Sequence, residues 1–267
     1  MTTELLHIER YPMHALESAA GQALVAGSRE RLQTRGSFNL PGFLQPRALR
    51  DCVAELQPLL ASTAYRHAQD HDIYFSKTPP HPPPPAEVLK KLTSSNHTLT
   101  CDQLAGTLIR QIYEWRPLCD FLARVFETSH LYPMADPLAR LNVMGYGSGD
   151  RLNWHFDRAK YTVTLLLQEA ARGGVFEYRR NLRSDSDPNY SGVARLLAGE
   201  DDQIETFTVR AGTLSVFAGR YAAHSITPVE GETMRIIAVL SFVDEPDYRF
   251  SEQDRRQFYG RAEPVPG

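Results

Sequence analysis

The segment LNVMGYGSGDRLNWHFDRAKYTVTLLLQ (residues 141–168) decides the fold class of this chain. Its ends, residues 141–146 and 161–168, are runs of aliphatic, β-branched and aromatic side chains, a composition typical of β-strands. A glycine-containing turn follows the first run, and the NWHFD motif at residues 153–157 fits a further strand. The segment therefore predicts a β-sheet rather than a helical core.

Strand-like runs continue beyond this segment, and Gly, Asp, Asn or Pro turns separate most of them. The further runs are residues 174–178, 203–209, 213–217 and 234–243. Several short strands at such spacing are typical of an antiparallel sandwich or barrel. We therefore expect a mainly β fold with helical support, whose core is a double-stranded β-helix (jelly-roll, cupin-like) over residues 139–250.

Residues 181–200 interrupt the predicted strands and are rich in Asp, Ser and Arg. We expect this insertion to form a loop over one end of the jelly roll. Its residues 183–187 could close over a site as a lid, although an acidic and polar loop is usually just solvated.

The first half of the chain has helical rather than strand periodicity. Apolar residues recur at helical spacing over residues 46–61 and 104–113, with Thr100 or Asp102 as caps for the second helix. A further helix is expected after Pro117. We expect these helices, and another over residues 15–33, to flank the jelly roll on one face.

At about 150 residues per domain, a chain of 267 residues has one or two domains. We see no internal repeat and expect one domain over residues 1–267. Its residues 1–138 would supply mostly helical support and substrate-side loops, and its residues 251–267 a C-terminal tail. The segment KTPPHPPPPAE (77–87) holds six prolines and is expected to be an extended surface loop, or else a docking segment for an aromatic-lined groove.

Composition excludes several functional classes. Hydrophobic residues make up 42% of the chain and charged residues 23%, as in an ordinary globular protein. The formal net charge of -3 provides no global basic field for nucleic acid or an anionic membrane, and no apolar run approaches the roughly 18 residues of a membrane span. Three widely spaced cysteines imply no disulfide framework. We expect a cytoplasmic protein that acts on a small molecule or another protein, without nucleic-acid or membrane partners.

Chemistry is concentrated in the NWHFDR motif. His155 and Asp157 are two residues apart, so on a strand both side chains leave the same face, while Phe156 points into a core. One imidazole and one carboxylate form two-thirds of the facial triad that binds non-haem Fe(II) and leaves other coordination positions open. Because a lone H-x-D motif arises often by chance, the metal hypothesis depends on a third ligand.

A later strand offers that ligand. His224, in GRYAAHSITPVEG, lies just before a β-type run and after the run TLSVF. Arg235 then begins the last strong strand, where its guanidinium could clamp a dicarboxylate across the barrel through a bidentate fork. His155, Asp157, His224 and Arg235 in this order form a specific constellation.

At these residues the sequence resembles the Fe(II)/2-oxoglutarate-dependent oxygenase superfamily, over about residues 140–250. The stretch LNVMGYGSGDRLNWHFD is similar to the segment of prolyl-hydroxylase-like members in which a Tyr, a turn and the H-x-D motif follow one another. The stretch AGTLSVFAGRYAAHSITPVEGETMR resembles the block that carries the last metal ligand and the co-substrate Arg, although Gly231 comes one residue earlier and Arg235 one later than in that block. The resemblance implies His155, Asp157 and His224 as metal ligands and Arg235 and Tyr146 as 2-oxoglutarate contacts.

The resemblance also implies the reaction. Members bind Fe(II), 2-oxoglutarate and O2, often with ascorbate as a supporting reductant, and release succinate and CO2 while they oxidise a C–H bond. Thr164, with Thr162 on the same strand face, could hydrogen-bond the co-substrate, and Asn142 is expected near the triad. Lys160 and Arg220 are alternatives to Arg235 for its far carboxylate.

Within the superfamily, SFNLPGFLQP, HDIYF and GDRLNWHFDR look like a bacterial group of free-amino-acid halogenases and hydroxylases that act on lysine-like substrates. The halogenases of this group replace the ligand carboxylate with a small residue, which frees a site on iron for chloride. This chain keeps Asp157, so the resemblance implies a hydroxylase rather than a halogenase.

Substrate contacts are less defined by sequence. An amino-acid substrate needs partners for its ammonium and carboxylate groups. The candidates are Trp154, Asn153, His71, Asp72, Arg220, Asp150 and Glu177. A peptide, carrier-bound or natural-product substrate, a desaturation or cyclisation, and a non-catalytic jelly-roll binding protein remain the alternative hypotheses, and the oligomeric state is left open.

Overall fold

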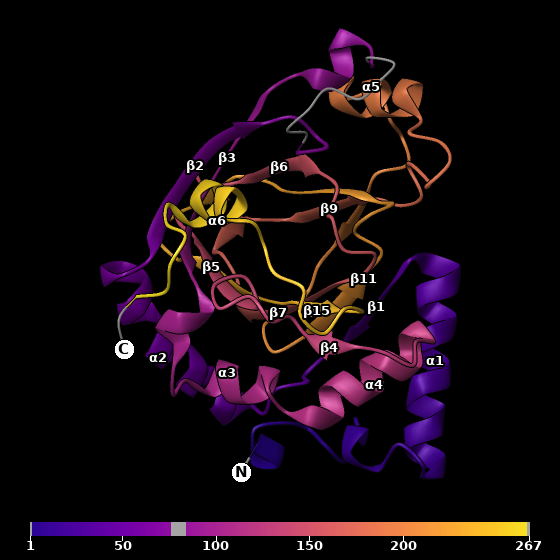
Figure 1. Cartoon of the computed structure of the whole chain (residues 1–267), viewed down its shortest axis with the longest axis vertical. Coiled ribbons are helices and arrows are strands. Elements are labelled where there is room, and N and C mark those ends of the chain that lie inside the picture. Colours follow the sequence, from indigo (N-terminus) through magenta and orange to yellow (C-terminus); the bar gives the residue numbers. More distant parts are fainter. Residues whose placement is uncertain (1, 76–83, 266–267) are drawn as a thin grey trace.

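The computed structural model describes residues 2–75 and 84–265, and they form two main antiparallel sheets (Figure 1). In the larger sheet the strand order is β1-β11-β7-β14-β5-β3-β2, and in the smaller one it is β10-β9-β12-β6. The larger sheet consists of β1 (Ser37–Leu40), β2 (Tyr65–His71), β3 (Leu92–Leu99), β5 (Leu141–Tyr146), β7 (Thr162–Gln168), β11 (Leu214–Phe217) and β14 (Arg235–Leu240). The smaller sheet consists of β6 (Leu152–His155), β9 (Phe176–Arg179), β10 (Glu205–Phe207) and β12 (Ala223–Ile226).

Two short ladders and several helices complete the architecture. The ladders are β4 (Tyr132–Pro133) with β15 (Phe242–Val243), and β8 (Arg172–Gly173) with β13 (Val229–Glu230). The α-helices are α1 (Ala19–Arg35), α2 (Pro46–Ser62), α3 (Leu108–Tyr113), α4 (Arg116–Phe126), α5 (Tyr190–Ala198) and α6 (Glu252–Tyr259). The 3-10 helices are η1 (Thr2–Glu4), η2 (Met13–Ala15), η3 (Ala86–Leu89) and η4 (Cys101–Leu104). The predicted mainly β, jelly-roll fold with helical support is confirmed.

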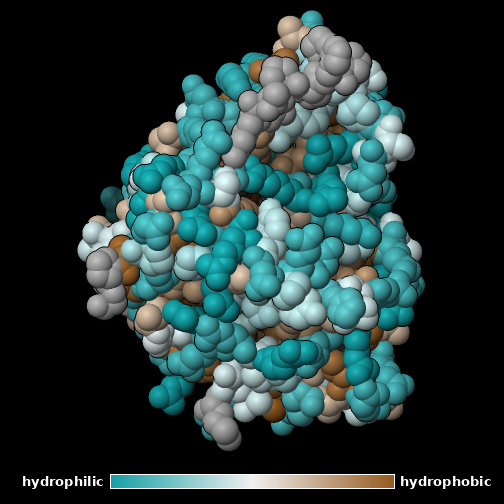
Figure 2. All heavy atoms as spheres, viewed as in Figure 1, coloured by the Kyte–Doolittle hydropathy of each residue, from teal (hydrophilic) through white to brown (hydrophobic). Residues whose placement is uncertain are grey.

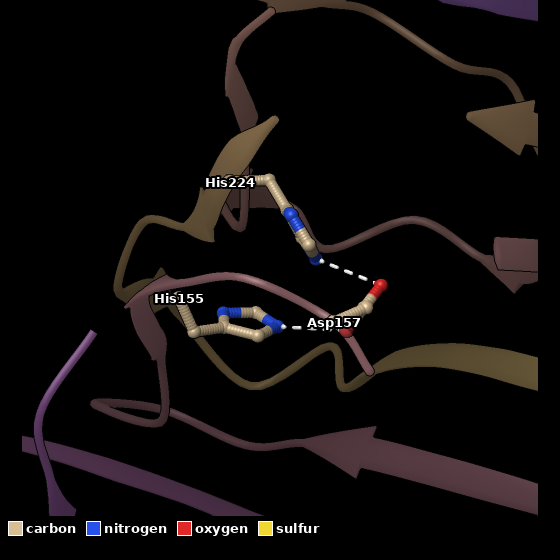
Figure 3. A group of neighbouring side chains, drawn as sticks. All are labelled: His155, Asp157 and His224. Carbon is tan, nitrogen blue, oxygen red and sulfur yellow. Dashed lines mark ion pairs between the residues drawn. The ribbon is translucent and has the colours of Figure 1, made fainter. Parts of the chain in front are cut away.

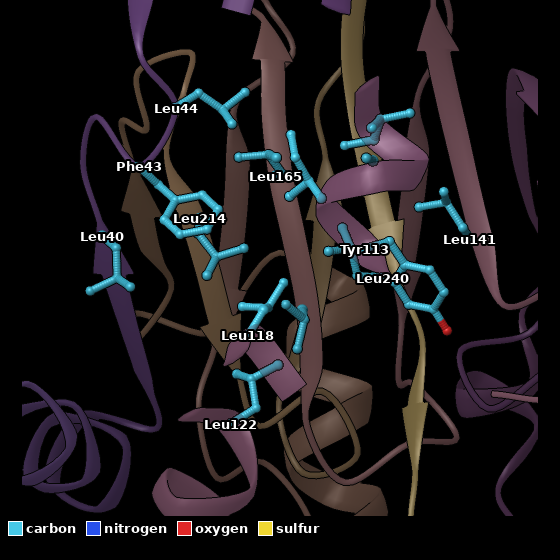
Figure 4. Packing of buried hydrophobic residues seen from close by; sticks show 14 of the residues in the cluster. Leu40, Phe43, Leu44, Tyr113, Leu118, Leu122, Leu141, Leu165, Leu214 and Leu240 are labelled. Carbon is cyan, nitrogen blue, oxygen red and sulfur yellow. The ribbon is translucent and has the colours of Figure 1, made fainter. Parts of the chain in front are cut away.

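The main hydrophobic core lies between the larger sheet and helices α1 to α4. Alternate residues of the central strands face these helices, including Val143, Leu165 and Leu240, all of them buried (Figure 4). The helices contribute residues such as Leu118 and Leu122, also fully buried. Because burying one such side chain stabilises a fold by about 1.5–3 kcal/mol, this layer anchors the sheet and frees its other face to line a site.

The opposite face of the larger sheet is turned toward the smaller sheet and is more polar. The intervening residues of β7 include Thr162 and Thr164, and those of β14 include Arg235. The same face carries Asn142 and Tyr146 on β5. A polar interior between two sheets is where a jelly roll can hold a ligand.

Two sequence predictions about the first half of the chain are wrong in part. The first half of the chain is not only helical and loop, since β1, β2 and β3 join the larger sheet. Strands β2 (YRHAQDH) and β3 (LTSSNHTL) lack apolar alternation because one face of each borders the polar interior. The expected helix over residues 104–113 is split into η4 and α3, and Gly106 between them has φ +77°.

The predicted loop and tail also contain helices. The insertion 181–200 holds α5, which starts after the N-cap Asn189 and ends at Gly199 in the left-handed conformation. The predicted tail holds α6, which starts after the N-cap Ser251 and ends at Gly260. In the proline-rich segment, residues 77–83 lie outside the described residues, and Glu87 is part of η3.

Helix α6 is tied to the barrel by a buried ion pair. Asp136, fully buried, accepts hydrogen bonds from the backbone N–H of Leu138, Ala139 and Phe250, and lies 2.9 Å from Nε of Arg255. The hydroxyl of Tyr259 donates to Oδ1 of Asn142 at 2.9 Å. The C-terminal segment therefore closes part of the jelly roll.

Hydrophilic side chains cover most of the face seen in Figure 2, and apolar ones are scattered among them. Among the described residues, no helix combines the length and apolarity needed to cross a membrane.

Candidate active site

The site lies at one end of the smaller sheet, where β6 and β12 run side by side. His155 and His224 are register partners on these strands, and their ring centroids are 4.1 Å apart. Asp157 follows β6, and the tips of both rings point toward its carboxylate (Figure 3). Its carboxylate oxygens lie 3.5 Å from Nε2 of His155 and 3.3 Å from Nε2 of His224. The three side chains form a potential metal site, with one ligating atom each and all three atoms within 4.8 Å of one another.

Both imidazoles are oriented by the backbone. Nδ1 of His155 lies 2.9 Å from the carbonyl oxygen of Asn153, and Nδ1 of His224 lies 3.0 Å from that of Ala222. A carbonyl can only accept, so each Nδ1 is assigned as the protonated nitrogen and each Nε2 carries a lone pair. Burial, reinforced by the neighbouring His224 ring, lowers the pKa of His155. The lowered pKa favours the neutral His155 ring, the state in which an imidazole binds a metal.

Asp157 is held from several directions. Its N–H donates to the carbonyl of Gly219 at 3.0 Å, and the hydroxyl of Thr162 donates to Oδ2. Position 219 requires glycine, because a Cβ atom there would collide with Oδ2 of Asp157 and with Oγ1 of Thr162. Burial alone would raise the pKa of this carboxyl, but a proton on Nε2 of His224 or His155 attracts the carboxylate and holds its pKa well below the usual range. The carboxylate is therefore ionised.

A second polar group lies on the interior face of the larger sheet. Arg235 and Tyr146 are register partners on β14 and β5, and both are buried. Nη1 of Arg235 has no hydrogen-bond partner among residues 2–75 and 84–265. Burial lowers the pKa of Arg235 and raises that of Tyr146 to about 12, so the Tyr146 phenol is neutral and does not compensate the guanidinium. Thr164, on the same sheet face, pairs in register with Ser215 and Val239.

Three residues that were predicted to contact the co-substrate or the substrate are bonded to, or packed against, other parts of the chain. The amide nitrogen of Asn142 donates to the carbonyls of Leu138 and Leu141, and its oxygen accepts from Tyr259. The amide of Asn153 donates to the Thr93 carbonyl. Trp154 points to the other face of β6 and packs in a second hydrophobic cluster, beneath α5.

The acidic candidates are also engaged elsewhere. Asp150 lies 2.7 Å from Nη1 of Arg66 and accepts a hydrogen bond from the hydroxyl of Ser95. Glu177 accepts a hydrogen bond from Ser225, the neighbour of His224 that points to the opposite face of β12. Oδ1 of Asp72 accepts from the backbone N–H of Tyr74.

His71 is brought beside the triad. Its ring centroid lies 6.4 Å from that of His155, and its ring stacks on Phe75 at 4.3 Å. Phe75 also contacts His155 at 5.4 Å and Phe258 of α6 at 6.1 Å. The sequence analysis missed both phenylalanines, although Phe75 belongs to the HDIYF motif, and together they form an apolar wall next to His155.

Lys160 and Arg220 are not placed with Tyr146 in the interior. Nε and Nη2 of Arg220 donate to the carbonyl of Arg158, and the ammonium of Lys160 lies over the Tyr161 ring. Arg235 is thus the predicted guanidinium that the fold buries on the interior face.

Two imidazoles and one carboxylate on one side of a polar interior are the donor set of non-haem Fe(II) sites that keep other coordination positions open. A family model described as Halogenase D matches residues 20–257. The chain belongs to this family.

Solved structures share the fold of this Halogenase D family member. AviO1 from Streptomyces viridochromogenes Tue57 is 16% identical with a TM-score of 0.56, over 84% of this chain and 96% of that one. The non-heme alpha ketoglutarate dependent carbocyclase SnoK from nogalamycin biosynthesis is 11% identical with a TM-score of 0.55, over 90% and 93%. A Pseudomonas putida prolyl-4-hydroxylase is 15% identical with a TM-score of 0.50, over 80% and 97%. No curated protein matches the chain in sequence.

The family match and the shared fold confirm the predicted resemblance to the Fe(II)/2-oxoglutarate-dependent oxygenase superfamily. They support a 2-oxoglutarate-dependent non-haem iron oxygenase.

Proposed function

We propose that this protein hydroxylates an unactivated C–H bond of a free amino acid or a similar small polar metabolite, and that 2-oxoglutarate is converted to succinate and CO2. The observation that carries the proposal is the Asp157 carboxylate, held between the two imidazoles. It supplies a third protein ligand at the position where halogenases of the resembling group have a small residue.

The residues present suit both groups that the reaction needs. Nε2 of His155, Nε2 of His224 and the Asp157 carboxylate would hold Fe(II). The buried guanidinium of Arg235, with its unpartnered Nη1, would bind the far carboxylate of 2-oxoglutarate, and Tyr146 and Thr164 would line its path. When bound, the iron and 2-oxoglutarate together supply the oxidising power from O2.

The protein's own residues would position the metal ligands and shield the reacting C–H bond from water. Backbone carbonyls keep both imidazoles in the ligating tautomer, and Thr162 and Gly219 hold the carboxylate in place. The wall of Phe75 and Phe258 beside His155 would exclude water from the reacting C–H bond. Fixing that bond next to the metal site decides which carbon is oxidised.

A small substrate is favoured by how closely the site is surrounded. Phe258 of α6 contacts Arg158, Phe75 of the HDIYF segment contacts His155, and Arg183 of the insertion contacts Phe156. We propose a cytoplasmic setting from the composition, with ascorbate as a supporting reductant.

A larger or natural-product substrate, or ring closure, is the second candidate, because a carbocyclase from nogalamycin biosynthesis shares the fold. A binding protein without activity is disfavoured, because such a protein has no need for an ionised carboxylate beside two buried imidazoles.

Succinate release from 2-oxoglutarate, measured across a panel of free amino acids with Fe(II), ascorbate and O2, tests the proposal. We expect one amino acid to stimulate release and to become one oxygen atom heavier by mass spectrometry. His224→Ala should abolish the signal, whereas His14→Ala, at an exposed histidine of η2, should retain it. A product with chlorine in place of hydrogen, or one lighter by two hydrogens, would contradict the proposed hydroxylation.

A further inference from the structure

Arg183 lies in the insertion between β9 and α5, and its guanidinium is stacked on the aromatic ring of Phe156. The distance from Cζ to the ring centroid is 4.0 Å, close enough for a strong cation–π contact. The same guanidinium lies 5.6 Å from the ring of Tyr74, which itself stacks on Phe156. The Phe156 ring points away from the His155 ring, and Arg183 is linked to the proposed metal ligands through the turn at residues 219–221. Nε of Arg183 donates to the Arg220 carbonyl, and the preceding carbonyl, that of Gly219, accepts from the N–H of Asp157.

The orientation of this guanidinium is fixed, but most of its donors are unused. Nε of Arg183 donates to the carbonyl of Arg220 at 2.6 Å. The backbone N–H groups of Leu182 and Arg183 both donate to the carbonyl of Tyr221. A guanidinium has five N–H donors, and the four on Nη1 and Nη2 have no acceptor within residues 2–75 and 84–265.

The neighbouring carboxylates already have partners. Asp185 accepts a hydrogen bond from the hydroxyl of Tyr221 at 2.8 Å. Asp157 is held by the two imidazoles and Thr162. Burial lowers the pKa of Arg183, as expected for a guanidinium partly removed from water without a carboxylate of its own.

A pre-oriented guanidinium with a free fork is the protein group that binds carboxylates most specifically. The co-substrate cannot use Arg183 for its far carboxylate if Arg235 binds that group on the interior face. We infer that Arg183 binds a carboxylate of the substrate and thereby positions the substrate beside Asp157. The inference rests on the proposed function and extends it, since it requires the substrate to carry a carboxylate that faces Arg183.

Binding without turnover tests this role. Trp154 packs in the same cluster as Phe156 and Tyr74, and the chain has two tryptophans, so Trp115→Phe leaves Trp154 as the sole tryptophan reporter. In that background, anaerobic protein with Fe(II) and 2-oxoglutarate is titrated with the common L-amino acids and with their carboxamides, which lack the carboxylate. Each titration is repeated in Arg183→Gln, in Arg183→Lys and in the matched control Arg195→Gln, an arginine of α5 that donates to the Glu200 carbonyl.

We expect at least one amino acid to bind about 10- to 100-fold more tightly than its carboxamide, the range for a charged hydrogen-bonded pair. Arg183→Gln should remove that difference by weakening the acid alone, Arg183→Lys should restore part of it, and Arg195→Gln should resemble the parent. Equal binding of acids and carboxamides, unchanged affinity in Arg183→Gln, or no binding of any acid would overturn the inference. The visible absorption band of the Fe(II)–2-oxoglutarate complex, recorded on the same samples, separates the two proposals, because its absence in the parent would refute the proposed function itself.

Discussion

Replacement of Arg235 by methionine should affect ligand binding and stability in opposite directions. The Arg235 side chain is only 6% exposed, and Nη1 has no acceptor in the part of the chain that the structure describes. Its register partner Tyr146 is neutral, because burial raises the phenol pKa to about 12. The ligand-free protein therefore holds a buried cation without a compensating anion.

The magnitudes follow from that imbalance. Loss of one partner of a buried, hydrogen-bonded charge pair costs about 2–5 kcal/mol of binding free energy. Arg235→Met should therefore raise the dissociation constant for 2-oxoglutarate by roughly 30-fold to a few thousand-fold. A buried polar group without a partner costs about 1–3 kcal/mol of folding free energy, so the same variant should be more stable than the parent when no ligand is present.

Urea unfolding with and without 2-oxoglutarate, in the presence of a divalent metal, measures both effects. Ligand that binds only the folded state adds RT ln(1 + [L]/Kd) to the free energy of unfolding. The parent should gain stability with 2-oxoglutarate and the variant should not, and Arg47→Met, at an exposed arginine of α2, should behave like the parent. A variant that is less stable without ligand and gains as much from 2-oxoglutarate would refute the assignment of Arg235.

Three further predictions concern the remaining buried polar groups. Gly219→Ala should weaken Fe(II) binding at least tenfold, about 1.4 kcal/mol, because the new methyl group displaces the Asp157 carboxylate. Calorimetric titration with Fe(II) measures the affinity, and an unchanged affinity would contradict the role of Gly219. Arg255→Met should lower the free energy of unfolding by about 3–5 kcal/mol, because Asp136 would be left as a buried unpaired charge. If urea unfolding shows a loss no larger than that of an ordinary surface substitution, the Asp136–Arg255 ion pair does not stabilise the fold in this way. Burial lowers the pKa of His67, so below the ordinary histidine pKa of about 6.5 the unfolded chain binds a proton that the folded chain does not, and stability falls with falling pH. His67→Gln should lose less stability than the parent between about pH 7 and pH 5.5, and identical urea midpoints in the two proteins at both pH values would show that His67 does not contribute.

The central strands could be predicted from the sequence because one face of each is continuously apolar. β5, β7 and β14 bury residues such as Val143, Leu165 and Leu240 against the helices, and that burial leaves a strong local signal. β2 and β3 carry no such signal. The pairing of β3 with β5, and of β2 with β3, is decided by tertiary context, since residues such as His67 and Ser94 face the polar interior.

The proposed ligands were accessible to sequence reasoning for a similar reason. His155 and Asp157 are two residues apart in a strand-like motif, and His224 is preceded and followed by strand-like runs, so strand periodicity predicts that they share one face. In the structure β6 ends at His155, and Asp157 follows directly after it. Phe75, Phe258 and Arg183 reach the site from segments far apart in the chain. No local pattern distinguishes them from ordinary core or surface residues. Only the closed fold shows that Phe75 contacts His155, that Phe258 contacts Phe75, and that Arg183 contacts Phe156.

The central claim is that His155, Asp157 and His224 hold Fe(II) in a site that also accepts 2-oxoglutarate. Anaerobic titration of the metal-free protein with Fe(II) and then 2-oxoglutarate, followed in the visible range, tests it most directly. The account predicts an absorption band that needs both components, saturates at one equivalent of iron, and is lost in His224→Ala but kept in His14→Ala. A parent protein that gives no band, or a His224→Ala variant that gives the full band, would contradict it.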